Sequence, residues 1–463
     1  MIQSHEIDIC KIGIYVKAIK GLQSNSSSPA DNWVIEFIDN VHYNGKIHKK
    51  AFLKIFVNHN TVKYSTKYPE FLLKLKALNY EINIYTKVIN PLINNNICPN
   101  FIKNLGNSLN CTYNDLLDII KNKLSFEGVL LKDYEHAQVL KRNISYILLQ
   151  QPKRPSINDN KSYGYSKDFS LYDEIKYCII LNEDSDSPVL SRWVRNNSKL
   201  STFLEELWNI IFQICVGCYA MSLSKLVHND LHHDNIFIKD LGESVYMNYI
   251  INGKSMLIKT RYQPLIYDFD RSYSEMYGEN ELLNGYFYDL HSQCNIFIEN
   301  KDIIKILCYL YRDVESVQSH ILNSITKNEE QKINITSSYN LETVKTPDNK
   351  KKKCFLQYVE LSSTKIEAIP NKWYTDFNNC TEIINNIYDK YIMKYLEDVK
   401  VTSENTFYCS DKYFFENGTI DYDQLKMDKD HEILLVSIKT DGIIKKGSGK
   451  KKKKSKKSRR KYF

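Results

Sequence analysis

Long apolar runs are what this sequence most plainly lacks. No stretch approaches the roughly 18 uninterrupted apolar residues of a membrane-spanning helix, so no transmembrane segment is predicted. The first residues include Glu6, Asp8 and Lys11, where a secretory signal would need an apolar core. These absences predict an intracellular, cytoplasmic protein.

The sequence also lacks a cysteine framework. Its 11 cysteines are scattered, and Cys215-Val-Gly-Cys218 has no second C-x-x-C to complete a metal or redox site. Because this pair lies within an apolar pattern of helical spacing, two buried thiols are the favoured interpretation. Reduced cysteines agree with an intracellular setting.

Acidic residues are lacking at the carboxyl end. Twelve of the 63 lysines and arginines lie from Lys445 onward with no acid among them, and the remaining 51 face 55 acidic residues. The net charge of +8 therefore belongs to the tail. We predict a disordered polybasic tail at 443–463, for which solubility, nuclear targeting, nucleic-acid contact and binding to anionic membrane stay open.

Hydrophobic periodicity predicts strands early in the chain and helices later. Strands are expected at 12–19, 32–38, 50–57, 98–102 and 177–181, with Asn44-Gly45 as a hairpin turn and a helix over 69–89. The region 107–170 is interpreted as an insertion. Later expectations are a helix over 201–223, a hairpin turning at Asn252-Gly253, a mobile loop at 326–353 and a helix over 380–396.

The most informative pattern is His228-Asn-Asp230-Leu-His-His-Asp-Asn235, followed by Tyr267-Asp268-Phe269-Asp270. Phosphoryl transfer needs one carboxylate to orient the attacking hydroxyl, and a second carboxylate with an amide to hold Mg²⁺. Asp230, Asp268 and Asn235 supply these groups in that arrangement. A helix cap or turn is the alternative role of a lone Asp230, but it does not account for the ordered set.

A histidine cluster and a strand lysine are further candidate site residues. The histidines His228, His232 and His233 suggest zinc, yet the sequence contains no HExxH helix, so zinc is disfavoured. Lys54, in Ala-Phe-Leu-Lys-Ile-Phe, lies on a predicted strand before a helix that carries Glu81. Glu81 would pair with Lys54, and Glu70 in the same helix is a competing partner.

These motifs resemble the protein-kinase-like superfamily, in particular the divergent serine/threonine kinases of large cytoplasmic DNA viruses. The resemblance implies an α+β, bilobal fold: a small β-rich lobe (1–182) and a larger, mostly helical lobe (183–442). It implies an ATP- and Mg²⁺-dependent enzyme acting on protein, in the host cytoplasm or the virion.

The resemblance also implies a role for each matching residue. Asp230 would be the catalytic base and Asn235 and Asp268 the metal ligands, with Lys54 and Glu81 aligning ATP. The remaining implied cofactor-binding residues are Gly21 beside a serine-rich turn, and Asn182 and Glu183 between the lobes. His228 would support the loop. Asp289 would anchor the backbone of the catalytic loop, or else cap a helix.

Several positions depart from the family pattern. No G-x-G-x-x-G or A-P-E occurs, Asn229 replaces the arginine that receives an activating phosphate, and Asp270 replaces the glycine of D-F-G. His232 stands where protein-serine kinases have lysine and small-molecule kinases often have histidine, and it is taken as a catalytic residue. A small-molecule kinase of the aminoglycoside or choline kinase type and a pseudokinase scaffold therefore remain alternatives.

Overall fold

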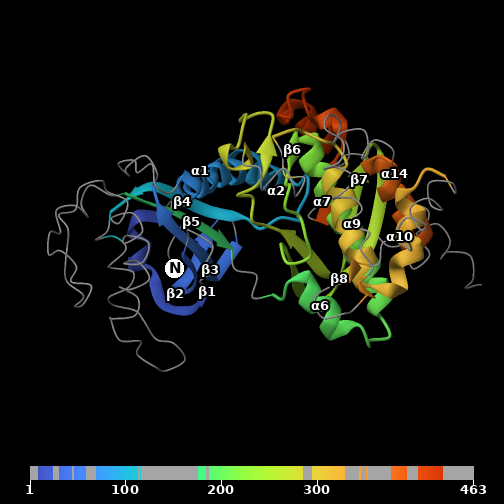
Figure 1. Cartoon of the computed structure of the whole chain (residues 1–463), viewed down its shortest axis with the longest axis horizontal. Coiled ribbons are helices and arrows are strands. Elements are labelled where there is room, and N and C mark those ends of the chain that lie inside the picture. Colours follow the sequence, from blue (N-terminus) through green and yellow to red (C-terminus); the bar gives the residue numbers. More distant parts are fainter. Residues whose placement is uncertain are drawn as a thin grey trace, which may run out of the picture.

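The computed structural model describes residues 9–23, 31–43, 46–58, 69–112, 115, 176–183, 187–284, 293, 295–328, 344–345, 351–352, 377–393 and 405–430. The protein is a mixed α+β structure, with a strand-rich N-terminal region and most of the helices later in the chain (Figure 1). This confirms the predicted class.

The N-terminal region is built on a five-stranded antiparallel sheet of order β1-β2-β3-β5-β4. The strands are β1 (Val16–Gln23), β2 (Asp31–Tyr43), β3 (Lys46–Val57), β4 (Asn104–Cys111) and β5 (Tyr177–Glu183). Trp33 and Ile35 of β2 and Leu53 and Ile55 of β3 are buried at alternate positions, the spacing that puts side chains on one face of a strand.

Two strand predictions were misplaced. Residues Ile9–Ile14 form a 3-10 helix, so the first strand begins at Val16 instead of residue 12. No strand opens at Cys98: the backbone amides of Ile97 and Cys98 donate to the carbonyl of Leu92, and Pro99 has no amide hydrogen. The next strand starts at Asn104 and continues to Cys111, inside the region interpreted as an insertion.

One helical stretch lies against the sheet region (Figure 1). It comprises α1 (Pro69–Ile84), a π-helical turn (Tyr85–Ile89) and α2 (Asn90–Asn94). Leu75, Leu78 and Ile82 are buried at helical spacing, which confirms the helix predicted over 69–89.

The later part of the chain is arranged around α7 (Phe203–Leu223). This helix has the length and composition of a membrane span, but 89% of its apolar window is buried inside the protein, so it is only weak evidence for one. Cys215 and Cys218 lie within it, both buried and unpaired, and burial raises the pKa of each thiol. The interpretation as buried thiols is confirmed.

The expected hairpin is present and long. It consists of β7 (Ile236–Ile251) and β8 (Lys254–Ile266), and β12 (Thr406–Cys409) pairs with β7 in parallel. Asn252 and Gly253 both have positive φ, at 48° and 80°, as a tight two-residue hairpin turn requires. The short strands β6 (Leu226–Val227) and β9 (Tyr273–Ser274) pair with each other.

The remaining α-helices lie on the same side of the molecule as α7 (Figure 1). They are α6 (Leu190–Asn197), α9 (Lys301–Asp313), α10 (Gln318–Ile325), and α14 (Cys380–Ile387) with a π-helical extension (Tyr388–Ile392). A capping box of Asn379 and Glu382 starts α14, and buried Ile383, Ile384 and Ile387 confirm the helix expected there.

Other expectations fall largely on residues that the structure does not describe. The tail at 443–463, the Asn44-Gly45 turn and most of the insertion lie outside the described residues. Strands β2 and β3 nevertheless pair up to Tyr43 and Lys46, on either side of that turn. Within the loop expected at 326–353, the described residues include the paired strands β10 (Val344–Lys345) and β11 (Lys351–Lys352).

Candidate active site

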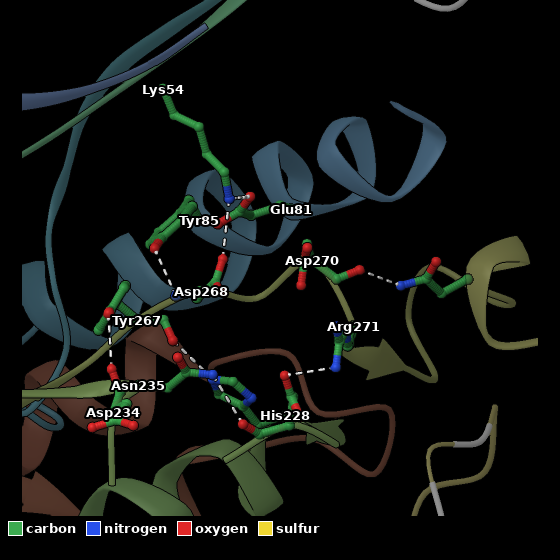
Figure 2. A network of polar contacts seen from close by, with 12 residues as sticks. Lys54, Glu81, Tyr85, His228, Asp234, Asn235, Tyr267, Asp268, Asp270 and Arg271 are labelled. Atoms are coloured by element: carbon green, nitrogen blue, oxygen red, sulfur yellow. Dashed lines mark hydrogen bonds and ion pairs between the residues drawn. The ribbon is translucent and has the colours of Figure 1, made fainter. Parts of the chain in front are cut away.

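A buried ion-pair chain joins three elements that are far apart in the sequence (Figure 2). The Nζ atom of Lys54, on β3, lies 2.7 Å from Oε2 of Glu81 on α1 and 3.0 Å from Oδ1 of Asp268, after β8. Lys54 is 6% exposed and Glu81 1%. The predicted Lys54–Glu81 pair is therefore present, and Glu81 is the carboxylate of α1 that forms an ion pair with Lys54.

The charges of this chain shift one another's protonation. Burial opposes the charge on Lys54, but the carboxylates of Asp268, Glu81 and Asp270 raise its pKa well above the ordinary value. Burial also disfavours charge on Asp268, but Lys54 holds the pKa of Asp268 below its usual range. Lys54 is thus an ammonium beside an ionised Asp268 at neutral pH.

Asp270 and Glu81 differ from Asp268 in this respect, because burial raises the pKa of each of them. Burial, followed by the charge of Asp268, raises the pKa of Asp270 to about 8. Asp270 stands where D-F-G has a glycine, and its side chain adds a third carboxyl group close to Lys54. At neutral pH it is mostly protonated in the folded protein.

The segment between β6 and β7 is held by its own side chains. Asn235 Nδ2 donates to the backbone carbonyl of Asp230 at 3.0 Å, and an imidazole nitrogen of His228 lies 2.9 Å from the carbonyl of Tyr267. The amide of Tyr267 donates to the carbonyl of Asn235 at 3.2 Å, which brings Asn235 beside Asp268. The His228 side chain thus connects the loop to the Tyr267–Asp270 motif.

The predicted metal residues suit Mg²⁺ by their donor atoms. The amide nitrogen of Asn235 is engaged with Asp230, which leaves its side-chain oxygen as the acceptor. The Asp268 side chain is 35% exposed and keeps a second carboxylate oxygen besides the one that contacts Lys54. An amide oxygen and a carboxylate are ligands of the kind that Mg²⁺ prefers.

Two residues that the sequence did not single out hold the Asp230 carboxylate. Nη1 of Arg271 donates to Oδ2 at 3.0 Å, and Nε2 of Gln293 donates to Oδ1 at 2.8 Å. Arg271 directly follows the Tyr267–Asp270 motif, and that proximity was the available signal. Gln293 lies in a stretch without periodicity or motif, and no sequence signal points to it.

A third missed residue is Asp302, near the start of α9. Its Oδ2 accepts from the backbone amide of His228 at 2.6 Å, and its Oδ1 accepts from the amide of Asn229 at 3.2 Å. This is the anchoring contact expected of Asp289, which lies outside the described residues.

A cluster of aromatic rings links the two motifs to the N-terminal region. The ring of Phe269 lies 4.9 Å from that of His228, 5.3 Å from Tyr85 and 6.5 Å from Phe101, measured between centroids. Phe269 is fully buried. Phe269 directly follows Asp268, whose φ of 69° is left-handed and strained for a residue with a side chain.

His228, His232 and His233 form no zinc site with other residues that the structure describes. Among the described residues, no group of three or more His, Cys, Asp and Glu side chains could hold a metal ion. His232 Nδ1 accepts from the amide of Asp234 at 3.1 Å. Burial lowers the pKa of His232 despite the opposing charge of Asp230, so the ring is neutral at pH 7.

The remaining predicted cofactor residues lie on the N-terminal sheet. Gly21, on β1, pairs with Val34 next to an irregularity in the β1–β2 register, while residues 24–30 lie outside the described residues. Asn182 and Glu183 end β5. The side-chain oxygen of Asn182 accepts from Nδ2 of Asn104 at 3.0 Å, and a carboxylate oxygen of Glu183 accepts from the backbone amide of Lys103 at 3.2 Å.

Comparison with known proteins gives one distant relative. Over 192 residues the chain is 27% identical to "Uncharacterized protein 179R" of Invertebrate iridescent virus 6, a match that covers 38% of this chain. It covers 16% of that viral protein, so the chain spans about a sixth of its relative's length. No protein-family profile matches the chain.

Proposed function

We propose that this protein has a bilobal protein-kinase-like fold and transfers phosphate from ATP, with Mg²⁺, to serine or threonine hydroxyls of a protein. The single observation that carries the proposal is Lys54 held between Glu81 and Asp268, close to the loop that bears Asp230. These residues come from four separate parts of the chain, and each matches a motif of that superfamily.

The proposed chemistry follows from the position of each charge. The Lys54 ammonium binds phosphate oxygens of ATP, while Asn235 and Asp268 hold the metal ion that neutralises them. The oxygen of the serine or threonine hydroxyl bonds to the terminal phosphorus of ATP, and the bond between that phosphorus and ADP breaks. Asp230 accepts the proton that the hydroxyl loses. Arg271 and Gln293 keep the Asp230 carboxylate in one orientation.

The second candidate is a small-molecule kinase, which His232 favours. The neutral imidazole of His232 lies near Asp230, where a protein kinase would place a lysine. Against this candidate, the stretch between Asp268 and the anchor at Asp302 leaves enough chain for a protein-binding platform. A pseudokinase scaffold would have no need of the assembled Lys54–Glu81–Asp268 chain.

The cellular setting is part of the proposal. The viral origin of the distant relative agrees with a viral-type kinase in the host cytoplasm or the virion. The polybasic tail would add contact with nucleic acid or with an anionic membrane surface.

Radiolabelled ATP separates the three candidates. Wild type and Asp230→Asn are offered generic protein substrates and then small alcohols, and binding of Mg-ATP is followed by thermal shift. We expect label on protein seryl or threonyl groups, a loss of at least about 100-fold in Asp230→Asn, and an equal thermal shift in both. Label on small alcohols alone would favour the second candidate. Neither label nor thermal shift in wild type would favour the scaffold.

A further inference from the structure

The segment that follows Asp270 is bonded to helix α1 through one side chain, Tyr80. The Tyr80 hydroxyl accepts from the backbone amide of Ser274 at 2.8 Å and donates to the carbonyl of Gly278 at 3.0 Å. Burial raises the pKa of Tyr80 to about 12, so the hydroxyl keeps its proton and both bonds persist at physiological pH.

Neighbouring side chains on α1 and its extension support the same contact. The rings of Tyr80 and Tyr277 pack edge to face at 6.5 Å, and Lys87 Nζ lies 5.4 Å from the centroid of the Tyr277 ring. One turn before Tyr80, Lys76 Nζ lies 2.5 Å from Oε2 of Glu281. The helix therefore contacts the 274–281 segment along several turns.

The opposite edge of this segment is bonded to the catalytic loop. In the β6–β9 pairing, Ser274 lies opposite Leu226 and Tyr273 opposite Val227, the residue directly before His228. Asn280 Nδ2 also donates to the carbonyls of Asp270, at 2.9 Å, and Ser272, at 3.0 Å. The segment thus bridges from the loop of Asp230 and the metal motif to α1.

Tyr80 directly precedes Glu81 in the helix. A rotation or shift of α1 that moved Glu81 away from Lys54 would also have to break both hydrogen bonds of Tyr80. We infer that Tyr80 is a positioning residue, which fixes α1 against the 273–281 segment so that Glu81 stays paired with Lys54. The inference rests on the proposed function, because Lys54 matters only if it binds nucleotide.

The test is Tyr80→Phe, which keeps the ring and removes the two hydrogen bonds. The matched control is Tyr422→Phe, at a tyrosine that is 54% exposed. Hydrogen exchange of peptides covering 69–89, melting temperature, Mg-ATP affinity and kcat/KM are measured for both. We expect faster exchange in α1 and a loss of about tenfold in kcat/KM for Tyr80→Phe only, since each bond contributes a modest amount.

A double-mutant cycle with Glu81→Gln distinguishes positioning from general support of the fold. If Tyr80 acts through Glu81, adding Tyr80→Phe to Glu81→Gln causes little further loss of Mg-ATP affinity or kcat/KM. Full additivity, or a lower melting temperature with unchanged exchange in α1 and unchanged kinetics, would overturn the inference while the proposed function stands. A wild-type protein that neither binds nor uses ATP would refute the proposed function itself, and the inference with it.

Discussion

Asn229, in the candidate catalytic loop, forms a fully buried pair with Lys301. The Lys301 Nζ atom, at the start of α9, donates to the Asn229 side-chain oxygen at 2.6 Å, and both residues are inaccessible to solvent. Lys305 Nζ also donates to the Asn229 carbonyl at 2.6 Å. The position at which the protein-kinase motif has a phosphate-binding arginine is therefore an interior asparagine beside two lysines in this protein.

Asn229→Arg should be strongly destabilising. The variant would bury a third cation beside Lys301 and Lys305 at a fully buried position, and we expect a loss of about 3 kcal/mol or more in the free energy of unfolding. Urea denaturation measures it. Asn96→Arg is the matched control, since Asn96 also has a left-handed backbone (φ 52° against 63°) but is only half-buried. Equal losses in the two variants would contradict the argument from buried charge.

Lys54→Met should cost stability as well as nucleotide binding. It leaves Glu81 buried without its partner, which typically costs about 3 to 5 kcal/mol. The double variant Lys54→Met with Glu81→Leu removes the orphaned carboxylate and should recover at least half of that loss. Urea denaturation of the two variants compares them directly, and a double variant no more stable than the single one would argue against the pairing.

Asp302→Asn should impair turnover more than binding. The asparagine can still accept one backbone hydrogen bond from the loop but no longer two, so Asp230 loses its fixed position relative to the phosphate. We expect kcat to fall at least about tenfold with Mg-ATP affinity unchanged. Asp423→Asn, at an exposed aspartate, controls for the loss of one negative charge. A fall in ATP affinity with kcat unchanged would place Asp302 in a different role.

Asp270 should make the metal-free protein less stable as pH rises. Its carboxyl has a pKa of about 8 in the folded protein, raised by burial and by Asp268, and an ordinary value near 3.8 when unfolded. Between these values the folded state binds the extra proton, so Asp270 lowers stability by up to about 1.4 kcal/mol per pH unit. The variant Asp270→Asn does not have this pH-dependent loss of stability, because its side-chain amide does not titrate. Urea denaturation from pH 4 to 8 measures the difference in free energy of unfolding between wild type and variant. This difference should widen steadily with pH, and a constant difference would refute the role given to Asp270.

The main residues of the candidate site could be predicted from the sequence because each stands in a local motif. Lys54 follows from strand periodicity, Asp230 and Asn235 from their spacing of five residues, and Asp268 from its position after an apolar strand. Glu81 was predicted with Glu70 as a competitor. The structure pairs Glu81 with Lys54, and the side chain of Glu70 lies outside the described part of the chain.

Arg271, Gln293, Asp302 and Tyr80 could not be assigned in the same way. Their partners lie 41, 63, 74 and 194 residues away in the sequence. Contacts of this kind depend on how β6, β9, α1 and α9 pack, and side-chain periodicity within one element carries no information about them. Asp302 was not considered as the anchor for the same reason, since no motif or spacing in the sequence links it to the His228–Asn235 loop.

The sequence by itself determined the class of fold, the hairpin turn at Asn252-Gly253, the buried core helix and the identity of the charged groups. These follow from local properties: periodicity, left-handed turn residues and the spacing of carboxylates. Only the tertiary structure decided which carboxylate Lys54 meets, what holds Asp230 and what anchors its loop. Such pairings are fixed by burial, because a charge withdrawn from water is stable only beside the partner that packing brings to it.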